Sequence, residues 1–266
     1  RQRLFQASIG RGLGGDHDTR RLVIDLARAR AERAALLGFA HHADYVAADG
    51  CAGSAAAVAE LLTSLVPAVR RNVRAEAAEL DAVLQRLTPG ATLEPWDWQY
   101  LAELVRTERY QVDANRLRPY LELERVLHEG VFAAATAFYG ITFTERTDLS
   151  GYHPQVRVWQ VDEADGSPIG LFLGDFHTRE SKNGGAWMNN LVDQNHLLGQ
   201  LAVVCNNANL VRPAAGEVTL MAWDDVITLF HEFGHALHGL LSDVRYPSKS
   251  GTNTPRDFVE YPSQVN

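Results

Sequence analysis

The sequence is poor in cysteine and in long apolar runs, and each shortage excludes a class of protein. Cys51 and Cys205 are the two cysteines among 266 residues, and neither has another cysteine nearby. A disulfide scaffold and a sulfur-rich metal site are therefore not expected. No run reaches the roughly 18 apolar residues of a membrane-spanning helix, and the first thirty residues lack the order of a secretory signal. We expect a soluble, cytoplasmic protein with no membrane partner.

Clustered basic residues are also missing. The formal net charge is −8, from 25 basic and 33 acidic residues. Neutralising nucleic-acid phosphates needs grouped Lys and Arg, so we expect no nucleic-acid partner. The composition is otherwise that of a globular protein, with 46% hydrophobic and 22% charged residues, and the length suffices for a sizeable core.

The first part of the sequence predicts long helices. Residues 18–50 are rich in Ala, Leu and Arg, and a second helix is predicted from an N-cap at Ser54 to a stop at 88–90, with Pro67 as a kink. Two further helices are predicted over 96–109 and 119–140. We therefore assign residues 1–150 to a helical region.

After Ser150 the pattern changes to strands. Residues 156–161 and 169–173 flank an Asp165-Gly166 turn signal, which indicates a hairpin. Residues 185–188 and 201–205 could add two strands. The predicted fold is mainly α (α+β), with long helices and a small antiparallel sheet, and residues 151–266 form the second region.

A further helix, beside the sheet, is predicted after Trp223, with Asp224 as its N-cap. It carries four ionisable residues among apolar ones: His231, Glu232, His235 and His238. Buried ionisable groups are costly unless they are paired or bound to metal. His231 and His235 are one helical turn apart, so both imidazoles can hold one Zn²⁺ from the same face.

Glu232 follows the first histidine in this H-E-x-x-H pattern and points about 100° round the helix. It can therefore act as a base on a water at the metal rather than as a ligand. We accordingly predict that this is a catalytic helix and that residues 151–266 form the catalytic region. His238 projects from nearly the same face as His231, and we expect it beside the ligands or in the substrate pocket. The alternative is a helix whose histidines satisfy core hydrogen bonds, since this short motif also occurs by chance.

The third metal ligand separates the possible zinc families. A metzincin has a histidine six residues after His235, where this sequence has Leu241. A gluzincin has a glutamate on a later helix, and Glu260 is the only glutamate after Glu232. Thr254 is the predicted cap of that helix, with Pro255 at its first position. We expect one Zn²⁺ per chain, held by His231, His235 and Glu260.

Longer segments resemble one family. The run FHEFGHALHGLLSDVRYPSKSGTNTPRDFVEYPSQ (230–264) resembles the zinc-site signature of the family of thimet oligopeptidase, oligopeptidase A and the peptidyl-dipeptidases. The segment GLFLGDFHTRESKNGGAWMNN (170–190) resembles the β-region of this family. The segments RQRLFQASIGRG (1–12) and DTRRLVIDLARARAERAALLGF (18–39) resemble its central helices. The bacterial peptidyl-dipeptidases, or dipeptidyl carboxypeptidases, are the most similar subfamily.

The resemblance implies a largely helical, neurolysin-like fold whose deep channel admits short, unstructured peptides. It also implies that His231, His235 and Glu260 bind zinc and that Glu232 is the base. The predicted function is therefore a zinc metallopeptidase that releases C-terminal dipeptides or cuts short oligopeptides. Gly185 and Ala186 are the candidate strand edge for the substrate backbone, although an ordinary buried strand fits the same residues.

The ends of the sequence leave an alternative function open. The chain begins with Arg1 rather than Met and stops soon after Glu260, as an internal piece of a longer protein would. The family resemblance implies a tyrosine-rich stretch further downstream that stabilises the oxyanion and holds the substrate. This piece could therefore be an inactive zinc-binding fragment. A metal-free peptide-binding module is a third possibility.

Overall fold

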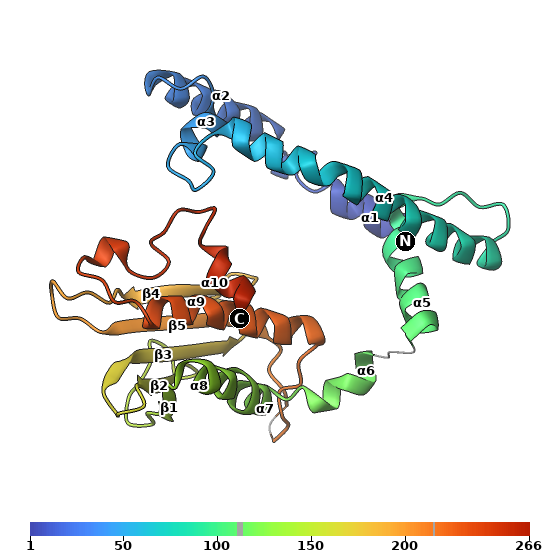
Figure 1. Ribbon diagram of the computed structural model, residues 1–266. Helices are drawn as coiled ribbons and strands as arrows, with labels where there is room; N and C mark the ends of the chain where they lie inside the picture. The colour runs from blue at the N-terminus through green and yellow to red at the C-terminus, as the bar shows by residue number, and fades with distance from the viewer. Residues whose placement is uncertain (111–113, 215) are drawn as a thin grey trace. The chain divides into compact units, whose positions relative to one another are not determined.

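The computed structural model describes residues 1–110, 114–214 and 216–266 (Figure 1). The chain divides into two compact units, Arg1–Asp113 and Ala114–Asn266. The composition change near Ser150 thus falls inside the second unit. In the described residues, no helix is long and apolar enough to cross a membrane.

The first unit is helical. Its main helices are α1 (Gln2–Ile9), α2 (Arg20–Leu36), α3 (His42–Ala47), α4 (Ala55–Leu87) and α5 (Trp98–Tyr110). The predicted cap of α4 is confirmed, because Ser54 Oγ accepts a hydrogen bond from the Ala57 N–H at 3.1 Å. The single helix predicted over 18–50 is wrong. Gly38 adopts a left-handed φ of 80° just after α2, which ends that helix before α3 begins.

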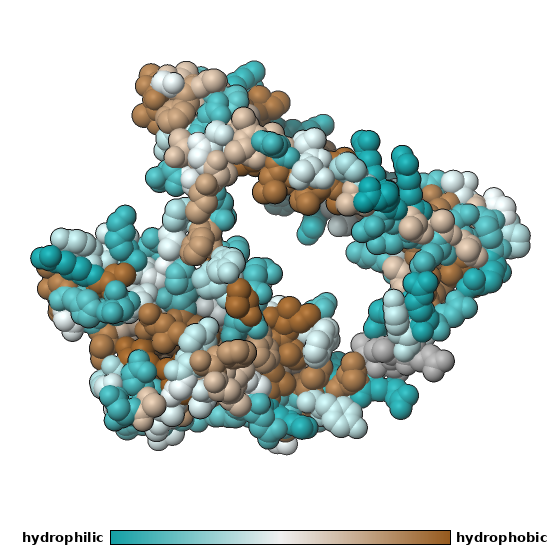
Figure 2. Space-filling view, in the orientation of Figure 1, coloured by the Kyte–Doolittle hydropathy of each residue, from teal (hydrophilic) through white to brown (hydrophobic). Residues whose placement is uncertain are grey.

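A small core joins α4 and α5 in this unit. It consists of the buried residues Leu80, Val83, Leu84 and Leu101. The earlier part of α4 instead carries exposed apolar side chains, among them Leu61, Leu62, Leu65, Val66 and Val69. Figure 2 shows hydrophobic side chains gathered along the helices of this unit. Exposed apolar surface of this kind is typical of a face that another protein segment covers.

The second unit begins with short helical segments. They are α6 (Ala114–Leu117), α7 (Leu123–Arg125), the π-helical segment η4 (Val126–Phe132) and α8 (Ala133–Tyr139). The helix predicted over 119–140 is thus present from Leu123 onward, with a π-helical middle. The predicted end of this helix is confirmed, because Gly140 follows α8 with a left-handed φ of 74°.

The sheet of the second unit has five strands in the order β1-β2-β3-β5-β4. They are β1 (Thr142–Glu145), β2 (Arg157–Asp162), β3 (Pro168–His177), β4 (Trp187–Val192) and β5 (Ala202–Leu210). The predicted β2–β3 hairpin is confirmed, but the prediction of a wholly antiparallel sheet is wrong. After β3 the chain forms β4 at the edge of the sheet, and β5 then lies between β3 and β4. β5 therefore pairs parallel with β3 and antiparallel with β4.

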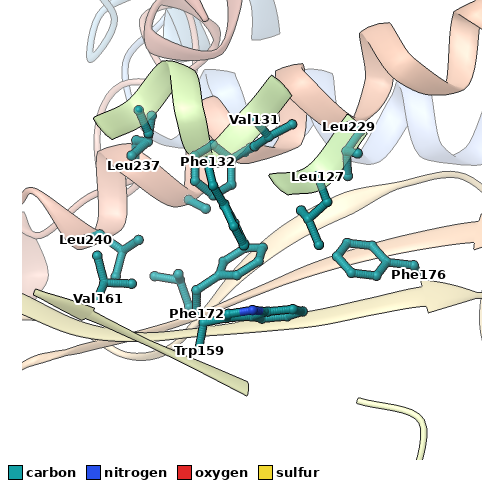
Figure 3. Packing of buried hydrophobic residues seen from close by; sticks show 14 of the residues in the cluster. Leu127, Val131, Phe132, Trp159, Val161, Phe172, Phe176, Leu229, Leu237 and Leu240 are labelled. Atoms are coloured by element: carbon teal, nitrogen blue, oxygen red, sulfur yellow. The ribbon is translucent and has the colours of Figure 1, made fainter. Parts of the chain in front are cut away.

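One face of the sheet packs against η4, α8 and α9 (Trp223–Leu240). The rings of Phe132 and Trp159 are 5.5 Å apart, and those of Phe172 and Phe233 are 5.3 Å apart. Figure 3 shows Phe132 reaching from the helix toward Phe172 and Trp159 on the sheet. On α9, the contact of Phe233 with Phe172 sets the face that this helix turns to the sheet, and therefore the direction of its polar residues.

Candidate metal centre

Helix α9 begins two residues earlier than a cap at Asp224 would place it. Ala222 is the N-cap, and the Asp225 carboxylate accepts a hydrogen bond from the Ala222 N–H at 2.8 Å. The prediction of Asp224 as the cap is therefore wrong, because Asp225 reaches back to the first free N–H from the third helical position. Both aspartates lie in the first turn, where negative charge stabilises a helix.

His231 and His235 lie on one face of α9. Their ring centroids are 5.0 Å apart, and His235 is only 8% exposed. Burial lowers the pKa of His235, which favours the neutral ring. A neutral imidazole is the form that binds a metal.

Glu260 approaches both histidines from α10 (Glu260–Val265). Its Oε2 lies 3.0 Å from Nε2 of His235 and 3.2 Å from Nε2 of His231. Ser263 Oγ donates a hydrogen bond to the same oxygen at 3.1 Å. Burial acts to raise the pKa of Glu260, but Ser263 and the two histidines lower it overall. The carboxylate is thus favoured in its charged form.

These three side chains fit a divalent zinc ion. Their ligand atoms all lie within 4.8 Å of one another, and no other group of three such residues converges in the described parts of the chain. Two imidazole nitrogens and one carboxylate oxygen are a donor set typical of catalytic zinc sites. Two rings directed at one oxygen atom also suit a shared cation better than a single hydrogen bond.

The segment that brings Glu260 to this point differs from the prediction. Residues 255–259 form turns, in which the N–H groups of Phe258 and Val259 donate to the Pro255 carbonyl at 2.9 and 3.1 Å. The helix begins at Glu260 itself, and the buried Thr254 Oγ1 has no partner among the described residues. Thr254 therefore does not cap a helix starting at Pro255, and that prediction is wrong.

Glu232 faces a cavity rather than the interior of the ligand group. The cavity has a volume of ≈ 240 Å³, and Gly185 and Ala186 line it together with Glu232. Burial raises the pKa of Glu232, as does Glu260, whereas His231 and a backbone hydrogen bond from Met188 lower it. The structure thus brings the predicted base and the predicted substrate edge to one cavity.

His238 lies in a different hollow of the same unit, lined also by Gly234, Leu237 and Ser242. Its Nδ1 is buried and has no partner among the described residues. Its role beside the ligands or in a substrate pocket stays a prediction.

Residues 1–266 match the sequence profile described as Peptidase family M3. The chain belongs to peptidase family M3. The predicted resemblance to the oligopeptidase and peptidyl-dipeptidase family is thereby confirmed.

Several peptidases are similar to this M3 chain. Dipeptidyl carboxypeptidase of Escherichia coli K12 is 48% identical over 267 residues, which cover 100% of the chain and 39% of that protein. Oligopeptidase A of Salmonella typhimurium LT2 is 35% identical over 254 residues, covering 94% of the chain and 37% of that protein. Mitochondrial intermediate peptidase of Malassezia globosa is 29% identical over 282 residues, with coverages of 90% and 35%. The M3 chain thus spans about two fifths of the length of these relatives.

Sequence reasoning missed several polar residues that line the Glu232 cavity of the M3 chain: Asn206, Asn207, Asn209 and Thr228. Asn209 Nδ2 donates to the carbonyls of Asn183 and Gly185 at 2.8 and 2.7 Å, so it holds the glycine segment before β4 in place. The sequence does contain a signal for these asparagines, because Asn206, Asn207 and Asn209 directly follow the apolar run of a predicted strand. Polar residues are unusual in a buried strand.

Proposed function

We propose that this chain carries the centre of a zinc metallopeptidase that hydrolyses short peptides and releases dipeptides from their C-termini. One observation supports this most strongly: the Nε2 atoms of His231 and His235 lie 3.2 and 3.0 Å from the same oxygen of Glu260. A carboxylate follows the first histidine and lines the neighbouring cavity. This combination is what peptide hydrolysis by a base beside a metal requires.

The roles of the residues follow from their chemistry. His231, His235 and Glu260 would hold Zn²⁺, which lowers the pKa of a water molecule and polarises a peptide carbonyl. Glu232 takes the proton of the attacking water as the new C–O bond forms. It then gives that proton to the departing nitrogen as the C–N bond breaks.

The substrate proposal rests on the edge of the sheet. β4 is one of the two edge strands of the sheet, and Gly185 and Ala186, which directly precede it, line the Glu232 cavity. An extended peptide can add to such an edge through backbone hydrogen bonds, and residues with small side chains permit its close approach. Release of dipeptides is favoured over internal cleavage because the identity to dipeptidyl carboxypeptidase, 48%, exceeds the 35% to oligopeptidase A.

The test compares short peptides with free and amidated C-termini, using the full-length protein and Glu232→Gln. The proposal predicts dipeptide products from the free peptides, little turnover of the amidated ones, and a variant that keeps zinc but loses activity. Intact turnover by the metal-free protein would contradict the zinc mechanism. Zinc binding without any turnover would instead support a non-catalytic zinc-binding role.

A further inference from the structure

Asn206 is a buried amide that lacks a partner. The residue is 1% exposed, and neither its Oδ1 nor its Nδ2 has a hydrogen-bond partner among the described residues. Leaving both ends of a buried amide unpaired destabilises a fold, and native proteins keep few such groups. A leucine of similar shape would avoid this cost, so the amide calls for a functional explanation.

The position of Asn206 places it next to the proposed base. Asn206 pairs across the sheet with Met188, whose backbone lies near enough to Glu232 to lower the pKa of its carboxyl. Antiparallel partners have Cα atoms about 4.5–5.5 Å apart. Asn206 and Glu232 also line the same cavity.

The Asn206 side chain also points to the correct face of the sheet. Val204, two residues earlier on β5, faces α9, because a Cβ added at Gly239 would lie 2.8 Å from Val204 Cγ1. Side chains two apart on a strand share a face. Asn206 therefore faces the helix that carries Glu232.

We infer that Asn206 is a positioning residue, whose amide N–H holds the Glu232 carboxylate directed at the metal site, either directly or through one water. A substrate is a poor partner for the amide, because Asn206 is almost fully buried. The two side chains are not bonded in this structure, so the link needs a water or a rotation of the amide. The inference rests on the proposed peptidase function.

Asn195 provides a matched control. It is also 1% exposed, but its amide is fully used. Its Nδ2 donates to the Asp193 carbonyl and to Gln200 Oε1 at 3.0 and 2.9 Å, and its Oδ1 accepts from the Leu198 N–H at 2.8 Å. Asn195 does not line the Glu232 cavity. Replacing it removes satisfied hydrogen bonds and nothing from the site.

The experiment makes Asn206→Leu and Asn195→Leu in the full-length protein and measures melting temperature, zinc content, kcat and KM. For Asn206→Leu we expect an equal or higher melting temperature and an unchanged zinc content. We expect kcat to fall about tenfold or more, with KM within about twofold of wild type, because one well-placed hydrogen bond is lost. For Asn195→Leu we expect a melting temperature lower by several degrees and little change in kcat of the folded fraction.

An active wild-type protein and an Asn206→Leu variant with unchanged kcat would overturn the inference alone. A fall in melting temperature as large as that of Asn195→Leu would also overturn it, because the amide would then be structural. If Asn206→Leu does not fold, Asn206→Ala decides, since it adds no volume: the same loss of kcat supports the inference, and wild-type kcat overturns it. A wild-type protein that binds zinc but cleaves no peptide overturns the proposed function and this inference together.

Discussion

At the scale of single residues, the Glu260 carboxylate connects two parts of the chain that are otherwise separate. His231 and His235 belong to α9, whereas Glu260 lies on α10, and its Oε2 is within 3.2 Å of both ring nitrogens. Neither helix alone supplies a complete ligand set. The proposed metal site therefore depends on the contact between the two helices.

Removing this carboxylate tests the ligand assignment. Glu260→Ala leaves two histidines, so we expect zinc affinity to fall at least a hundredfold, measured by competition with a chromophoric chelator. His196→Ala is the control, because His196 is an exposed histidine that pairs with Asp243 and lies outside the converging group. It should keep wild-type zinc affinity. Equal affinity in Glu260→Ala and wild type would remove Glu260 from the ligand set.

Asp175 is a second residue with a strong expected effect, on stability rather than catalysis. It is fully buried and accepts hydrogen bonds from Arg179 at 2.7 Å, Tyr152 at 2.8 Å and Lys182 at 3.1 Å. Burial acts to raise the pKa of Asp175, but these partners lower it to about 2 from 3.8. The Lys182 side chain is only 3% exposed, so it depends on this carboxylate.

We expect Asp175→Asn to lower the free energy of unfolding by about 3–5 kcal/mol at pH 7, because it leaves buried cations without their counter-ion. Since folding lowers the pKa of Asp175, its stabilisation is complete above pH 3.8 and is lost as the pH falls toward 2. Urea unfolding at neutral and acid pH measures both effects. A variant as stable as wild type at pH 7 would show that the network is not stabilising.

At the scale of elements, the packing of α10 on α9 sets the position of Glu260. A Cβ added at Gly234 would lie 2.7 Å from Ser263 Cα and 3.1 Å from the Pro262 carbonyl oxygen. Both are backbone atoms, which cannot move aside as a flexible side chain can. The glycine is therefore what allows the two helices to approach closely.

Gly234→Ala should consequently push α10 away and lower zinc affinity at least tenfold, although alanine is the better helix former. Gly239→Ala is the matched control in the same helix. Its Cβ would meet Asn190, Val204 and Met188 on the sheet instead of α10. We expect Gly239→Ala to lower the melting temperature but to keep zinc affinity. Titration of zinc into both variants distinguishes these outcomes, and unchanged affinity in Gly234→Ala would refute the packing explanation.

The elements also show what local sequence can predict. Ser54 and Gly140 marked the start of α4 and the end of α8, because caps act through neighbouring backbone groups. The four-residue spacing of His231 and His235 likewise predicted rings on one face of α9. The start of α10 at Glu260 was missed because the local signals at Thr254 and Pro255 indicated an earlier start. The parallel pairing of β5 with β3 was missed because strand patterns carry no information about which strands are neighbours.

At the scale of the whole molecule, the proposed metal links folding to ligand binding. Its ligands come from α9 and α10, so the complete site exists only in the folded chain. A ligand at a hundred times its Kd stabilises the folded state by about 2.7 kcal/mol. Zinc should therefore raise the stability of the protein by a few kcal/mol.

Chelation is the corresponding measurement. Treating the full-length protein with excess EDTA should lower its melting temperature by several degrees, and adding zinc back should restore it. Glu260→Ala should already melt at the lower temperature and should not respond to EDTA. A wild-type melting temperature independent of EDTA, in protein shown to have lost its zinc, would exclude this link.

The central claim is that His231, His235 and Glu260 bind zinc, and anomalous scattering at the zinc absorption edge tests it most directly. In crystals of the full-length protein, we predict one strong peak about 2.0–2.2 Å from the Nε2 atoms of both histidines and from a carboxylate oxygen of Glu260. Crystals of Glu260→Ala should lose most of this peak. A zinc peak elsewhere in the protein, or no peak in crystals that still cleave peptides, would contradict the claim.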